Sequence, residues 1–184
     1  MFSSVSSSDY APGSPPSSLL FTTPSLTGTA ATSQQFADVV AYHGKIDLSF
    51  QVKIVNFDAH AGDVSLARIG YQDADWAVTL DYTGASGTLN EIASFADGAS
   101  YRSAHTASQP SPFDAWNTVD ILVDFDGHTI SLAYNGVSVL SDQDIANPVQ
   151  NNPNISIIMG LNYLGPPANP MTIFMDDIVI STPP

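Results

Sequence analysis

One stretch decides the fold class: Trp116-Asn-Thr-Val-Asp-Ile-Leu-Val-Asp-Phe-Asp-Gly-His-Thr-Ile-Ser-Leu-Ala-Tyr-Asn-Gly-Val-Ser-Val-Leu140. Apolar and polar residues alternate from 119 to 125 and again from 130 to 134, the period of two that gives a β-strand one apolar face. Asp126-Gly127 and Asn135-Gly136 follow these two runs, and both dipeptides tolerate the positive φ values of tight type I′ hairpins. The stretch predicts three consecutive antiparallel strands, with Trp116 packed in the core.

The same alternation extends outward from this stretch. It is clearest from Ile46 to Ile54, and weaker runs lie at 64–71, 76–82, 89–95, 101–106, 155–161 and 171–181. No ten-residue segment keeps the apolar stripe of a helix. The sequence therefore predicts an all-β protein, a two-sheet antiparallel β-sandwich or jelly roll of about ten to twelve strands. We expect a single domain over 1–184, with a Ser/Pro-rich loop or linker-like start at 1–18.

Charge excludes two classes of partner. Eighteen acidic residues against four basic ones give a net charge of −14, which repels nucleic-acid phosphates and anionic lipid surfaces. No apolar run is long enough for a bilayer-spanning helix, so membrane insertion is not expected. The start of the chain lacks the features of a signal peptide, but the acidic, lysine-poor surface composition is typical of exported bacterial proteins. We therefore expect a secreted or cell-surface location.

Several catalytic motifs are missing from the sequence. Retaining glycoside hydrolases of this type need paired carboxylates on one strand, as in E-x-D-x-x-E, and Glu91 is the only glutamate in the chain. Neither the G-x-S-x-G turn of serine hydrolases nor a phosphate-binding glycine loop occurs. The chain has no cysteine, so disulfides and zinc-thiolate sites are excluded.

Three further motifs accompany the meander of 116–140. They are Ser14-Pro-Pro-Ser-Ser-Leu-Leu-Phe21, Ile157-Ile-Met-Gly160 and Ile173-Phe-Met-Asp-Asp-Ile-Val-Ile180. In order and separation the set resembles the concanavalin A-like lectin/glucanase superfamily, which includes laminin G and MAM domains. The resemblance covers most of residues 14–182 and implies a jelly roll with a glycan or polysaccharide as partner.

The resemblance also suggests where a ligand would bind. Members of the superfamily use aromatic and polar side chains at the rim or on the concave sheet. The ligand-binding candidates of this type are Arg68, Tyr71, Tyr101 and His105, with Trp76 and Tyr163 as further aromatic residues.

The leading expectation is a non-catalytic recognition or adhesion module for carbohydrate, on an exported bacterial protein and with no catalytic residue assigned. Two alternatives remain open. One is a polysaccharide-active enzyme of the lyase type, whose concave-sheet site would neutralise a uronate and move a proton. The residues of the right types for this are Gln51, Arg68, Arg102, Tyr101 and His105. The other is a purely structural domain of a larger protein.

Asp176 is the one candidate metal ligand. Asp176 is an even number of residues from Phe174, Ile178 and Ile180, so in a regular strand its side chain lies on the same face as theirs. The pattern therefore places a carboxylate on the face expected for the core, where an unpaired charge is costly. In lectin-like and MAM-like relatives the first Asp of this strand helps to hold calcium or caps backbone amides near the chain's start. Both roles are open for Asp176, and structural calcium is the only cofactor that the sequence suggests.

Overall fold

A computed structural model describes residues 2–6, 11–14, 18–23, 32–39, 44–55, 63–71, 76–83, 88–95, 100–101, 115–144, 155–164 and 171–184. Within these residues every regular element is a strand, and no helix is long and apolar enough to cross a membrane. The strands are β1 (Phe2–Ser6), β2 (Ser18–Thr23), β3 (Thr32–Val39), β4 (Lys45–Val55), β5 (Asp63–Tyr71), β6 (Trp76–Thr83), β7 (Thr88–Phe95), β8 (Ser100–Tyr101), β9 (Asn117–Asp124), β10 (Thr129–Tyr134), β11 (Val137–Asp144), β12 (Ile155–Leu164) and β13 (Met171–Ser181).

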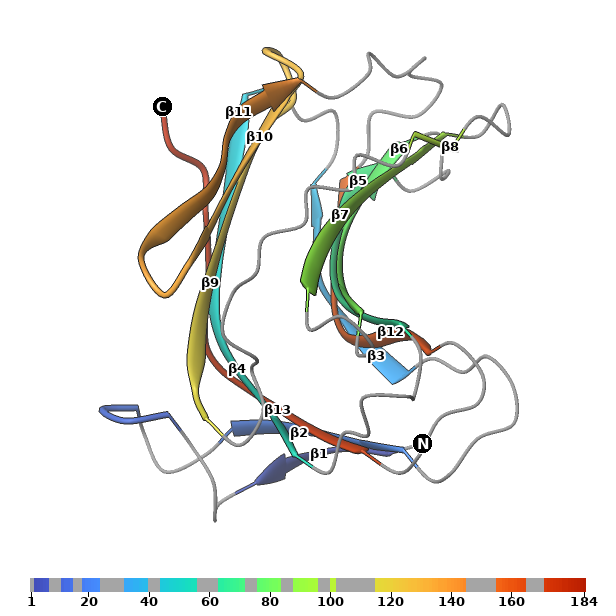
Figure 1. Ribbon diagram of the computed structural model, residues 1–184, viewed down its shortest axis with the longest axis vertical. Coiled ribbons are helices and arrows are strands. Elements are labelled where there is room, and N and C mark those ends of the chain that lie inside the picture. Colours follow the sequence, from blue (N-terminus) through green and yellow to red (C-terminus); the bar gives the residue numbers. More distant parts are fainter. Residues whose placement is uncertain are drawn as a thin grey trace.

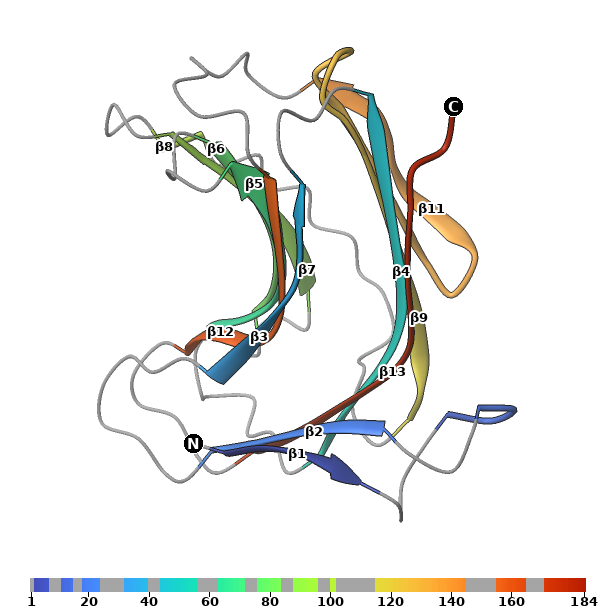
Figure 2. The ribbon, with the colours of Figure 1, turned by 180° about the vertical axis from the view of Figure 1, so that it is seen from behind.

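The strands form two antiparallel sheets. One has seven strands in the order β1-β2-β13-β4-β9-β10-β11, and the other has six in the order β3-β12-β5-β6-β7-β8. Both sheets curve in the same direction, so that the six-stranded sheet lies nested inside the seven-stranded one with its concave face turned outward (Figures 1 and 2). The predicted two-sheet β-sandwich is confirmed, with thirteen strands in the described part of the chain rather than ten to twelve.

The core lies between the sheets and follows the alternation in the sequence. β4 and β9 pair along their length, and in both strands every second residue is buried. Phe50, Val119 and Tyr134 are fully enclosed on the seven-stranded sheet, as are Ile157 and Met159 on the six-stranded one. The alternation in the sequence thus identifies the residues of each sheet that face the other sheet.

The two turns of the meander differ from each other. Asn135 and Gly136 both have positive φ, 50° and 74°, which confirms the type I′ turn predicted there. At Asp126-Gly127 that prediction is wrong, because the left-handed residue is His128, with φ 54°. The Asp124 carboxylate accepts hydrogen bonds from the backbone N–H groups of Asp126 and Gly127, at 3.1 and 2.6 Å. This side-chain cap favours a wider, four-residue turn.

Replacing Gly127 by alanine should lower the free energy of unfolding by about 1–2 kcal/mol. A Cβ at this position would lie 2.8 Å from an oxygen of the Asp124 carboxylate, so the new methyl group displaces the cap. Chemical denaturation measures the change, and Gly136→Asn is the comparison, because asparagine tolerates positive φ and Gly136 has open space beside it. Equal stability of Gly127→Ala and the native chain would contradict this account of the turn.

Two expectations about the fold are corrected. Trp116 is half-buried rather than in the core: its ring centroid lies 6.4 Å from that of Phe174, and the buried positions of β9 begin one residue later, at Asn117. Within the predicted loop at 1–18, Phe2–Ser6 forms β1, because the free edge of β2 supplies backbone partners along its whole length. A serine-rich segment can therefore be a strand when an edge is available to it.

Candidate functional site

The concave face of the six-stranded sheet is the first candidate surface. Arg68 lies between Ala67 and Ile69, each 1% exposed between the sheets, so position 68 belongs to the other, outward face. Strand pairing extends this face into three rows of positions that cross the sheet. The rows are Asp38-Ser156-Gly70-Ala77-Ser94-Ser100, then Gln35-Ile158-Arg68-Thr79-Ile92, then Tyr163-Ser65-Asp81-Asn90.

Arg68 lies in the second of these three rows, near its centre. It pairs with Ile158 of β12 and Thr79 of β6, and Gln35 of β3 pairs with the other edge of Ile158. Among the positions in the three rows, Arg68 carries the only cationic side chain. A guanidinium presents a fork of N–H donors that matches a carboxylate, so the middle row has the chemistry to receive an acidic sugar.

Irregular pairing brings Tyr163 into the neighbouring row. The register of β12 shifts between Met159 and Tyr163, next to Gly160 with its φ of 107°, and the register of β5 shifts between Ser65 and Ala67. Together these shifts pair Tyr163 with Ser65 on the concave face. Adjacent rows lie roughly 7 Å apart along a strand, within reach of one sugar unit bound between Arg68 and Tyr163.

Two of the other predicted ligand-binding residues, Tyr71 and Tyr101, do not share this face. Tyr71 pairs with the buried Ile155, and Tyr101 pairs with Ala93, whose row leads through Val78 to the buried Ile69. Both tyrosine positions therefore fall in register with the core. His105 lies outside the described residues, and its role stays a prediction.

The glutamine on the concave face is Gln35, not Gln51 as the sequence suggested. Gln51 lies on β4 of the seven-stranded sheet, where its amide donates a hydrogen bond to Asp177 at 2.7 Å, so it cannot contribute to the concave face. Gln35, which takes its place in the row of Arg68, is not singled out by the sequence, because β3 carries no clear alternation. Only the pairing of β3 with β12 places it there.

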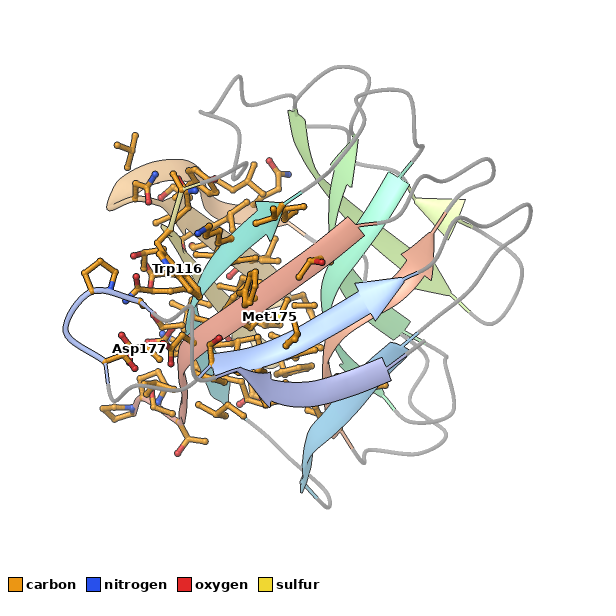
Figure 3. The ribbon with its side chains drawn as sticks, turned by 90° about the horizontal axis from the view of Figure 1, so that it is seen from below. Trp116, Met175 and Asp177 are labelled. Carbon is orange, nitrogen blue, oxygen red and sulfur yellow. The ribbon has the colours of Figure 1, made fainter. Side chains whose placement is uncertain are left out.

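Asp176 lies on the outer face of the seven-stranded sheet, not on the core face predicted for it. The buried positions of β13 are Ile173 and Met175, each 0% exposed, while Asp176 pairs with Gln51 of the outer face. It is nevertheless 9% exposed, because the turn at 11–14 covers it. Figure 3 shows this loop beside Asp177.

The Asp176 carboxylate binds both ends of that turn. One oxygen accepts a hydrogen bond from the Ala11 backbone N–H at 2.8 Å, and the other accepts from the Ser14 hydroxyl at 2.9 Å and from the Asp177 N–H at 2.8 Å. The turn itself closes from Ser14 N–H to the Ala11 carbonyl, with Gly13 at φ 91°, as a type II turn requires. These contacts are those expected of the capping role.

Structural calcium is the other role that the sequence leaves open for Asp176, and chelation tests it. Within the described residues no three or more His, Asp or Glu side chains gather to hold a metal. Because donors engage both oxygens of Asp176, we expect identical melting curves with and without EDTA. A melting temperature that falls with EDTA and returns on adding Ca²⁺ would contradict this and support structural calcium.

The outer face carries a shallow depression of about 180 Å³, lined by residues of β4, β9, β10 and β11. Asp47 and Asp120 both line it, and Ser49 donates a hydrogen bond to Asp120 at 2.6 Å. Burial, and secondarily the charge of Asp120, raises the pKa of Asp47 above its usual 3.8. The stability contributed by this group is therefore present below pH 3.8 and is lost as pH rises through the raised pKa.

Asp47→Asn should therefore raise the free energy of unfolding near neutral pH, by up to about 0.5 kcal/mol. The gain should vanish below pH 3.8, where Asp47 is protonated in both states. Denaturant titrations at the two pH values measure it. Asp126→Asn, in an exposed turn, controls for the loss of one negative charge, and an equal gain in both variants would contradict a local cause.

Comparisons with known proteins agree on the fold. No protein-family model matches the sequence, and neither does any curated protein. Similar solved structures include the family 7 alginate lyase A1-II′ (12% identity, 90% of this chain and 80% of that one, TM-score 0.62). Cellulose induced protein Cip1 shows 13% identity over 99% of this chain and 86% of its own, with TM-score 0.63. The alginate lyase AlyA1 from Zobellia galactanivorans shows 12% identity over 91% and 78%, with TM-score 0.55.

The chain thus has the concanavalin A-like jelly-roll fold that the sequence motifs suggested. The expected function is corrected. Most of the similar structures are alginate lyases, which overturns the leading expectation of a non-catalytic recognition module. The comparison favours its alternative, a polysaccharide-active enzyme.

Proposed function

We propose that this protein is a polysaccharide lyase that cleaves uronate-containing glycans on the concave face of its six-stranded sheet. The observation that carries the proposal is the position of Arg68, which shares its row with Gln35 and lies one row from Tyr163 of the neighbouring strand β12. Supporting it, the fold is similar to that of alginate lyases, one of them solved in complex with dimannuronate. Secretion or display at the cell surface belongs to the same proposal, because the substrate is a polymer.

The reaction is a β-elimination, and its difficult step is removal of the proton from C5 of the uronate. Arg68 pairs with the carboxylate at C6, with Gln35 as an additional amide donor, and this stabilises the negative charge that develops when C5 loses its proton. The electron pair of the C5–H bond then forms the C4–C5 double bond. The C4–O glycosidic bond breaks, and the leaving oxygen gains a proton.

Tyr163 is the group we assign to proton transfer. A phenol can take a proton as phenolate or donate one as a hydroxyl, and the row of Tyr163 lies next to that of Arg68. A carboxylate bound at Arg68 would therefore bring its own C5 and C4 toward that row. Elimination consumes no water and needs no oxidant, so side chains alone suffice.

The test is incubation of the purified protein with a panel of uronate polysaccharides while ultraviolet absorbance is recorded. The new double bond is conjugated with the carboxylate, so a lyase produces rising absorbance as the polymer shortens. Chain shortening without this absorbance would indicate hydrolysis and contradict the proposal. Saturable binding with no chain shortening on any polymer would contradict it as well.

A further inference from the structure

The basic residues of this chain are few, and their places restrict what the concave face can bind. There are four: Lys45, Lys53, Arg68 and Arg102. Lys45 and Lys53 alternate with the buried residues of β4 and so belong to the outer face of the seven-stranded sheet. Lys45 lies 3.7 Å from the Asp124 carboxylate, and the Lys53 amine lies 5.9 Å from the ring centroid of Phe174.

The concave face can therefore draw on Arg68 and, at most, on Arg102, which lies outside the described residues. The same three rows include two carboxylates, at Asp38 and Asp81. With a net charge of −14 on the whole chain, the field around this face disfavours polyanions, most strongly at low ionic strength.

Electrostatic repulsion disfavours the binding of a polymer made only of uronates to this face. Every sugar in it carries a carboxylate, so a bound segment brings several anions to a surface that can offer no more than two guanidinium groups. Like charges at short range cost more in a partly desolvated site than in water. Elimination itself needs only one carboxylate, on the sugar that loses its C5 proton.

We propose that the substrate is a heteropolysaccharide in which single uronates are separated by neutral sugars. This rests on the proposed lyase function and defines its substrate class. The uronate lies at Arg68, and neutral sugars lie over the flanking positions, which are mainly small or uncharged and polar. Residues of these types can approach a sugar ring closely or exchange hydrogen bonds with its hydroxyl groups; they are Gly70, Ala77, Ser94 and Ser156 on one side and Ser65 and Asn90 on the other.

Initial rates of unsaturated-product formation on two pairs of polymers test the proposal. Alginate and glucuronan are homopolymers of uronates, whereas hyaluronan and gellan carry uronates separated by uncharged sugars. At about 0.01 M NaCl we expect at least one separated-uronate polymer to react about tenfold faster than both homopolymers. Raising NaCl to about 0.5 M should raise the homopolymer rates more than the others, because screening removes the repulsion.

Substitution of the two aspartates of the concave face gives a second test of the same proposal. Asp81→Asn and Asp38→Asn each remove one negative charge from the concave face and should raise homopolymer rates at low salt by about two- to fivefold. Asp126→Asn removes the same charge from an exposed turn of the other sheet and should leave the rates unchanged.

The outcomes separate the two proposals. Homopolymers cleaved at low salt as fast as the separated-uronate polymers would overturn the substrate class and leave the lyase function standing. No unsaturated product from any of the four polymers at either salt concentration would overturn the lyase function and the substrate class with it.

Discussion

Arg68→Ala should lower kcat/KM for elimination by about 10²- to 10³-fold, the loss typical of removing one group that stabilises developing negative charge. The reason is that position 68 carries the only cation among the three rows of the concave face. Without it the uronate carboxylate keeps its full charge, and the C5 proton becomes less acidic. The measurement is the initial rate of ultraviolet absorbance on the best substrate of the panel.

Arg68→Lys and Lys53→Ala are the matched controls for this prediction. Lysine retains the charge but not the two-pronged donor geometry of arginine, so Arg68→Lys should keep only part of the activity. Lys53→Ala removes one positive charge from the opposite side of the molecule and should leave kcat/KM unchanged. Full activity in Arg68→Ala, with an unaltered melting temperature, would contradict the role of Arg68.

Asp176→Ala should lower the free energy of unfolding by about 2–4 kcal/mol, because hydrogen bonds to a charged group contribute about 1.5–3 kcal/mol and a buried donor left without a partner is costly. Asp176 accepts three such bonds, one from the backbone N–H of the fully buried Ala11. For a chain of this size the melting temperature should fall by roughly 5–15 °C. Differential scanning calorimetry measures the shift.

Two comparisons make this prediction specific. Asp176→Asn keeps one acceptor oxygen and should fall between the native chain and Asp176→Ala. Asp177→Asn changes the neighbouring, exposed carboxylate, and asparagine tolerates its φ of 48°, so it should cost far less. Asp176 lies on the face opposite the proposed site, so well below its melting temperature Asp176→Ala should retain the native kcat/KM. An Asp176→Ala protein as stable as Asp177→Asn would contradict the capping role.

Regular alternation made the fold predictable from sequence, and β-bulges limited what could be predicted of the site. The period of two in β4, β9 and β10 matches their burial residue by residue. Asp176 shows where such counting fails. It does share a face with Phe174, but Phe174 pairs with Lys53 and that face is the outer one. The register shift between Asp176 and Val179, with Asp177 at positive φ, then pairs Ile180 with the buried Leu48, so Asp176 and Ile180 do not share a face.

Register shifts and pairing between distant strands also limited what the sequence could predict of the concave face. Arg68 could be identified as a candidate from its residue type, but the row that it shares with Gln35 depends on pairing between strands far apart in the sequence. Tyr163 reaches its row only through the register shift after Met159, and Gly160 is the one local sign of that shift. Tyr101 shows the opposite error, since a suitable residue type falls in register with buried positions.

The new chain ends formed from a cleaved uronate polysaccharide test the central claim most directly. Elimination leaves an unsaturated uronate at the non-reducing end, so mass spectrometry of the oligosaccharides should show each such fragment lighter by one water than a hydrolysis product. We expect this unsaturated series with the native protein and its loss with Arg68→Ala. Saturated fragments, or no fragments from any uronate polymer, would contradict it.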